Sequence, residues 1–92
     1  RVGSTQDFLG LTDAEAAITD VRVALARALK SRRLKRHVSQ ATVAQLVGSS
    51  QARVARMEAG DPSVSLDLLF RTLLTFGTSP AEIGRVIAGA AA

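Results

Sequence analysis

The sequence of 92 residues contains no cysteine, no tryptophan and no tyrosine. Without cysteine there can be no disulfide framework, thiolate zinc site or cysteine nucleophile, and the absence fits a reducing cytoplasm. Phenylalanine, at three positions, is the only aromatic residue, and only two prolines occur. With so few aromatic residues, the core must be made from leucine, valine, isoleucine and alanine, which suits closely packed helices better than a β-sandwich. We therefore expect an all-α fold.

Long apolar runs are also missing, because none approaches the roughly 18 residues that a membrane-spanning helix needs. The first residues, Arg1 to Ser4, lack the charged-then-apolar order of a signal peptide. A chain of this length fits one domain. We expect an N-terminal extension over residues 1–11, a single domain over residues 12–92, and a location in the cytoplasm, in association with the bacterial nucleoid.

Positive charge is concentrated in one segment of the chain. The net charge is +4, but residues 21–37 hold seven basic residues and no acid, whereas residues 1–20 hold one basic residue and four acids. A basic block beside a nearly neutral remainder is typical of a protein that binds a polyanion, and nucleic acid is favoured over a membrane surface. A solvated helix face gives the same pattern, so charge alone leaves both interpretations open.

The first predicted helix begins at Thr12, where Thr12-x-x-Glu15 has the spacing of a capping box. It fades between Ser31 and Arg36, and His37 can take the left-handed conformation that often follows a helix. One apolar stripe at helical spacing predicts the buried side of this helix. Its residues are Ala14, Ala17, Ile18, Val21, Leu25, Ala28 and Leu29.

Four further helices are predicted, from Gln40 to Val47, from about Gln51 to Ala59, from Leu66 and from Pro80. Each is preceded by a serine that can accept a hydrogen bond from a backbone N–H group at the helix start, and the last one also has proline at its first position. Glycines that can adopt positive φ end three of them. The capping serines are Ser39, Ser49 or Ser50, Ser65 and Ser79, and the glycines are Gly48, Gly60 and Gly77.

The second and third helices meet the requirements of a helix-turn-helix over about residues 40–59. Two helices that cross closely need a small residue at their contact, a turn residue that accepts positive φ, and apolar residues that hold both helices to the core. Ala44 supplies the small contact and Gly48 the turn. The core-facing residues are Val43, Val47, Val54 and Met57.

The stretch VSQATVAQLVGSSQARVARMEAG, from Val38 to Gly60, resembles the lambda-repressor-like, XRE-type helix-turn-helix family, and Ser65 to Leu69 resembles the start of that family's fourth helix. The resemblance covers residues 21–77. His37 stands where the family usually has glycine, and Ser49 where it usually has valine or isoleucine. The resemblance implies a compact five-helix domain that reads the major groove of DNA with the helix from about Ser50 to Ala59.

The resemblance also implies roles for individual residues. Gln40 would contact a phosphate and support the reading side chain, Gln51 would pair with adenine, and Arg53 would contact guanine or a phosphate. Ser50 would offer its backbone N–H group to a phosphate, and Ala52 would touch a thymine methyl group. The basic residues from Lys30 to Arg36, at the end of the first helix, would reach flanking phosphates. The expected DNA-binding residues are Gln40, Ser49, Ser50, Gln51, Ala52, Arg53, Arg56, Arg33, Lys35, Arg36 and His37.

Other chemistry is not expected from this sequence. His37 is the only histidine and has no partners at metal-ligand spacing. The serines have the positions of helix caps and no base at a spacing that would activate them. We therefore expect no enzymatic activity, no catalytic residue, no metal site and no cofactor.

Two functions remain open. The first is a transcriptional repressor that binds a palindromic operator in double-stranded DNA as a homodimer, since one small domain reads few base pairs. The second is an antitoxin resembling the HigA-like antitoxins, which would bind a ribonuclease toxin and repress its own operon; a toxin gene beside this one would favour it. Packing inside the fold is the alternative role for the dimer candidates on the last helix. The dimer candidates are Ile83, Val86 and Ile87, or Phe8, Leu9 and Leu11 before the first helix.

Overall fold

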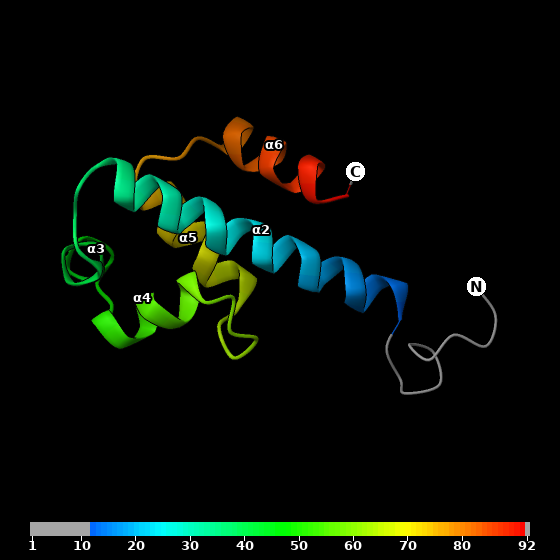
Figure 1. Ribbon diagram of the computed structural model, residues 1–92, viewed down its shortest axis with the longest axis horizontal. Coiled ribbons are helices and arrows are strands. Elements are labelled where there is room, and N and C mark those ends of the chain that lie inside the picture. Colours follow the sequence, from blue (N-terminus) through cyan, green and yellow to red (C-terminus); the bar gives the residue numbers. More distant parts are fainter. Residues whose placement is uncertain (1–11, 92) are drawn as a thin grey trace.

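The computed structural model describes residues 12–91 (Figure 1). The predicted extension over residues 1–11, with Phe8, Leu9 and Leu11, lies outside the described residues. The described part folds into five helices, and the expected all-α fold is confirmed. The helices are α2 (Asp13–Lys35), α3 (Gln40–Val47), α4 (Gln51–Glu58), α5 (Leu66–Thr75) and α6 (Pro80–Ala91).

The helix starts are fixed by side-chain caps, as the sequence predicts. Between the two candidates for α4, Ser50 is the cap, and its hydroxyl accepts a hydrogen bond from the backbone N–H of Arg53 at 3.1 Å. At α6 the capping box is reciprocal, because Ser79 accepts from the N–H of Glu82 while the Glu82 carboxylate accepts from the N–H of Ser79. At α2, α3 and α5 a single hydrogen bond makes the cap, in which the hydroxyl of Thr12, Ser39 or Ser65 accepts from the backbone N–H three residues later.

Left-handed backbone ends two of the helices that matter for function. After α2, His37 has φ 56°, as predicted for this residue although glycine is the usual choice there. After α3, Gly48 has φ 68° and begins the turn to α4. Both chain reversals are therefore fixed by local backbone conformation.

Helices α4, α5 and α6 pack against α2, whereas α3 packs against α4 and α5. Figure 1 shows α6 along one long side of α2 and α4 on the other side, near the C-terminal half of α2. The core between α2 and the remaining helices is mainly aliphatic, with Phe76 as the one aromatic member among its described buried residues. Its fully buried side chains include Leu25, Leu29, Val43, Val54, Met57, Leu69 and Leu73.

The apolar stripe of α2 is buried over only part of its length. Leu25 and Leu29 are fully buried and Val21 packs against the core, but Ala14 and Ala17 are exposed and Ile18 is 45% exposed. The first turns of α2 extend past the other described helices (Figure 1), so none of α3 to α6 covers this end of the stripe. The sequence prediction is therefore wrong for the part of the stripe before Val21.

Arginines attach α2 to the rest of the fold by contacts distant in sequence. Arg22 donates to the backbone carbonyl of Val64 in the α4–α5 loop, and Arg32 pairs with Glu82 on α6. Two more join α2 and its C-terminal end to other segments: Arg33 pairs with Glu58 on α4, and Arg36 donates to the carbonyl of Phe76 at 2.8 Å and lies over its ring. Much of the basic block therefore contributes to the fold.

Glu82 should make the free energy of unfolding decrease at acidic pH. Hydrogen bonds from the Ser79 N–H and from Arg32 lower the pKa of Glu82 from 4.5 to about 2. Because an unfolded chain binds this proton near pH 4.5, the contribution is present above that pH and is lost as the pH falls toward 2. Urea unfolding at several pH values should show that the free energy of unfolding falls less between pH 4.5 and pH 2 in Glu82→Gln than in the wild type. Parallel pH profiles for the wild type and the variant would contradict the prediction.

Candidate nucleic-acid interface

Helices α3 and α4 form a compact pair joined by a three-residue turn. Ala44 is 4% exposed at the pair, and the N–H of Ser49 donates to the carbonyl of Ala44 at 2.8 Å. A Cβ atom on Gly48 would meet nothing within 4 Å, so the positive φ and not a lack of space favours glycine there. The predicted core-facing residues Val43, Val54 and Met57 are fully buried, and Val47 packs against the core.

The opposite face of α4 is exposed to solvent. Gln51, Ala52, Arg53 and Arg56 are all exposed, and they share this face because Val54 and Met57 occupy the buried one. The structure thus brings together the four residues on α4 that the sequence predicts as DNA-binding. Their exposure leaves their polar groups accessible to a ligand.

A chain of hydrogen bonds fixes the position of Gln51. The guanidinium of Arg33 donates to both carboxylate oxygens of Glu58, at 2.6 and 2.9 Å. Glu58 also accepts from Gln40 Nε2 at 3.1 Å, and Gln40 Oε1 accepts from Gln51 Nε2 at 2.7 Å. We call these four residues the Gln51 support network. It connects α2, α3 and both ends of α4.

The buried end of the Gln51 support network is an ion pair. The side chains of Arg33 and Glu58 are 11% and 3% exposed, and hydrogen bonding to Glu58 raises the pKa of Arg33 further. A charged pair shielded from water holds its geometry better than a surface pair. At the exposed end, the amide of Gln51 keeps its oxygen and one N–H hydrogen unused by the network, and these two groups suffice to bind the N6 and N7 atoms of adenine.

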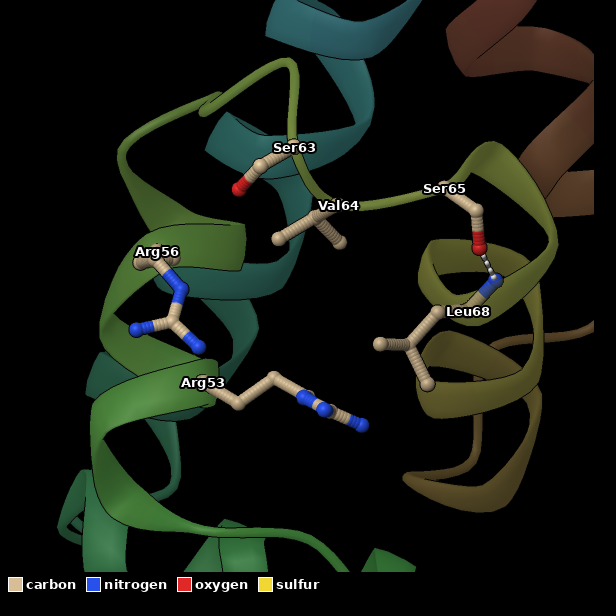
Figure 2. A pocket seen from close by; sticks show the side chains of 6 residues that line it. All are labelled: Arg53, Arg56, Ser63, Val64, Ser65 and Leu68. Carbon is tan, nitrogen blue, oxygen red and sulfur yellow. Dashed lines mark hydrogen bonds between the residues drawn. The ribbon is translucent and has the colours of Figure 1, made fainter.

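A groove lies between α4 and the start of α5. Arg53, Arg56, Ser63, Val64, Ser65 and Leu68 line it. Figure 2 shows the Arg53 side chain extending from α4 across this groove toward α5, and the Ser65 hydroxyl accepting the N–H of Leu68 at the helix start. Neither arginine side chain forms a hydrogen bond or ion pair with any of residues 12–91.

The electrostatics of this groove favour an anion. Two exposed arginines, Arg53 and Arg56, line the groove together with Ser65 at the N-terminal end of α5, and that end of a helix carries a partial positive charge. The pKa of Asp61 is lowered, chiefly by a hydrogen bond from the backbone N–H of Ser63 and to a smaller extent by the positive charge of Arg56. Sequence reasoning identified Ser65 only as a cap, because the approach of α5 to α4 is tertiary.

Three of the predicted DNA-binding residues have side chains that the structure occupies or shields. Arg33 is bound to Glu58, Arg36 is bound to Phe76, and the hydroxyl oxygen of Ser49 is buried without a hydrogen-bond partner among the described residues. Spacing could not reveal this, because the two arginine partners lie 25 and 40 residues away. Of the remaining residues near α2, Lys35 and His37 are exposed.

Two neighbouring serines in the turn should respond oppositely to the same substitution. Ser49→Ala removes a buried hydroxyl that has no partner in the described part of the chain, and should raise the free energy of unfolding by about 1 kcal/mol. Ser50→Ala removes the α4 cap and should lower it by about 1 kcal/mol. Urea unfolding measures both changes. A loss of stability in Ser49→Ala would show that its hydroxyl is satisfied after all.

The dimer candidates on the last helix lie mostly inside the fold. Ile83 is only 7% exposed and belongs to the core, so it has no surface to offer a second subunit. Val86 and Ile87 are half-buried and pack against the same core. Packing within the chain, the alternative left open by the sequence, therefore accounts for this apolar face.

Comparison with known proteins gives one match. A sequence profile described as helix-turn-helix matches residues 29–83, which is more than half of the chain. No curated protein and no solved structure matches. Within residues 12–91, every helix is too short or too polar to cross a lipid bilayer.

Proposed function

Because the chain belongs to the lambda-repressor-like, XRE-type helix-turn-helix family of DNA-binding regulators, we propose that it is a transcriptional repressor. It binds a palindromic operator as a homodimer and places α4 in the major groove. Each copy reads one half-site, and bound repressor hinders transcription from the operator.

The Gln51 support network is the observation that carries this proposal. An exposed glutamine ordinarily loses rotamer freedom when it binds, and this loss weakens the interaction. Gln51 is already hydrogen-bonded to Gln40, and through Glu58 to the buried Arg33. A side chain positioned in advance at the start of α4, with an unused donor and acceptor, suits direct contact with a base edge.

The groove beside α4 supplies the contacts that place the helix on the duplex. A backbone phosphate next to the major groove would meet Arg53 on one side and the N-terminus of α5 on the other. Lys35, the last residue of α2, and His37, just after the helix, are exposed and can bind a phosphate farther along the strand. Arg33, Arg36 and the hydroxyl of Ser49 have no part in this proposed surface.

Selection of bound duplexes from random DNA, with purified full-length chain, tests the proposal. We expect a palindromic sequence to emerge. Gln51→Ala should reduce the preference for the correct base at one position of each half-site by about 1–3 kcal/mol, and the preferences at the other positions should not change. Gln45→Ala is the matched control, because Gln45 is an exposed glutamine on α3 outside the Gln51 support network. No sequence preference, or equal losses in both variants, would reject α4 as the reading helix.

The antitoxin function has no separate support in the contacts of residues 12–91. The N-terminal extension, with Phe8, Leu9 and Leu11, lies outside the described part of the chain. Co-purification with a toxin encoded by a neighbouring gene would be the observation in its favour.

A further inference from the structure

One face of α2, beside the C-terminal end of α6, contains a shallow hollow. The hollow is lined by Asp20, Val23, Ala24 and Arg27 of α2, with Ala90 of α6 at its edge. This face lies away from the buried residues Leu25 and Leu29, and small or half-buried side chains occupy its centre. Another helix can therefore approach α2 closely at this point.

The charges on this face are unpaired and of opposite sign. Asp20 and Arg27 are exposed, and neither side chain forms a hydrogen bond or ion pair with any residue that the structure describes. They lie seven residues apart, which is about two helical turns or about 10 Å along the axis. Arg27 differs in this respect from Arg22, Arg32 and Arg33, which all bind other parts of the fold.

We propose that a second copy of this chain docks on this face, with the two α2 helices antiparallel. A two-fold axis midway between Val23 and Ala24 brings Asp20 against Arg27 of the partner subunit, and Arg27 against Asp20 of the partner subunit. The face is thus complementary to itself, as an isologous dimer contact requires. Two equivalent ion pairs flank a centre of small apolar side chains.

The same arrangement suits the proposed binding of a palindromic operator. Because α6 and α4 lie on opposite long sides of α2 (Figure 1), a two-fold axis running from the α6 side to the α4 side keeps both copies of α4 on one side of the dimer. Each α4 lies near the C-terminal half of its own α2, so antiparallel pairing places the two reading helices at opposite ends. Two half-sites on one face of a duplex require such a placement. The functional role of this dimer rests on the proposed DNA binding. The formation of the dimer does not depend on that proposal.

Charge exchange on the full-length chain tests the proposed contact. Sedimentation equilibrium without DNA should show a reversible dimer for the wild type. Asp20→Lys and Arg27→Glu should each weaken it about tenfold or more, since each creates two like-charge pairs per dimer. The double variant Asp20→Lys with Arg27→Glu should return to within about threefold of wild type, because the pairs are restored with their signs exchanged.

Arg85→Glu is the matched control, as Arg85 is an exposed cation on α6 that does not line the hollow. Thermal melts followed by circular dichroism will show that the variants remain folded. A wild type that stays monomeric, a dimer that resists both single reversals, or a double variant that fails to recover would each overturn the proposal.

The two proposals fail in different ways. If the monomeric single variants still bind a half-site duplex with the wild-type base preference, the loss of dimer leaves the reading role of α4 intact. If the wild type dimerises as expected but binds no duplex selectively, the repressor function fails and the dimer contact stands.

Discussion

Replacing Glu58 with alanine is expected to lower the free energy of unfolding by about 3 kcal/mol. Glu58 is 3% exposed, and its carboxylate accepts hydrogen bonds from both Arg33 and Gln40. Without it, the guanidinium of Arg33, which is 11% exposed, has no opposite charge and little access to water. An uncompensated charge in such a position is among the most destabilising results of a single substitution. Urea unfolding gives the magnitude.

The same substitution should weaken base selection, because it removes the middle of the Gln51 support network. The double variant Arg33→Met with Glu58→Leu separates the two effects. It replaces the ion pair with apolar side chains, so its stability should lie within about 1 kcal/mol of wild type, whereas Gln40 remains without its carboxylate and selectivity at the Gln51 base pair should still fall. Recovery of selectivity along with stability would show that the network does not position Gln51.

Ala44→Leu is expected to destabilise the domain by about 1–3 kcal/mol and to abolish specific DNA binding. Ala44 is 4% exposed, and its carbonyl accepts the N–H of Ser49 that closes the turn. A leucine there would force α3 away from α4, and Gln40 and Gln51, which lie on these two helices, would lose their 2.7 Å hydrogen bond.

Ala41→Leu provides the comparison for this prediction. Ala41 lies on the same helix but is exposed, so the added side chain enters solvent and stability should change by less than about 0.5 kcal/mol. Thermal melts and duplex binding should be measured for both variants. If the two variants behave alike, α3 and α4 do not meet at Ala44.

The local parts of this fold could be read from the sequence. Ser39 and Ser65 cap helices at the predicted positions, and His37 adopts the predicted left-handed conformation. In each case the signal lies within three or four residues of the group that it satisfies, and spacing along the chain identifies it. The burial of Val54 and Met57 was predictable for a related reason, since helical periodicity determines which side chains share a face.

Contacts between distant segments could not be read in this way. Nothing near Arg33 or Arg36 in the sequence distinguishes them from the exposed Lys35, because their partners come from α4 and from the end of α5. The exposure of Ile18 also could not be predicted from the sequence, because it depends on which helices lie beside α2. Its stripe has the correct periodicity, but the length of α2 exceeds that of the helices packed beside it. The sequence therefore predicted which side chains of α4 are exposed, but not that Arg33 and Arg36 bind Glu58 and Phe76. The DNA-reading role of α4 stays a prediction.

The arginine contacts of α2 have a consequence for how the domain opens. They join α2 to the α4–α5 loop, α4, the end of α5 and α6, so none of α4, α5 and α6 can separate from α2 without breaking these contacts. Amide hydrogen exchange in α4, α5 and α6 should then proceed through a single global opening reaction, with a common protection factor. The projecting first turns of α2, which lack these cross-links, should fray independently and exchange much sooner.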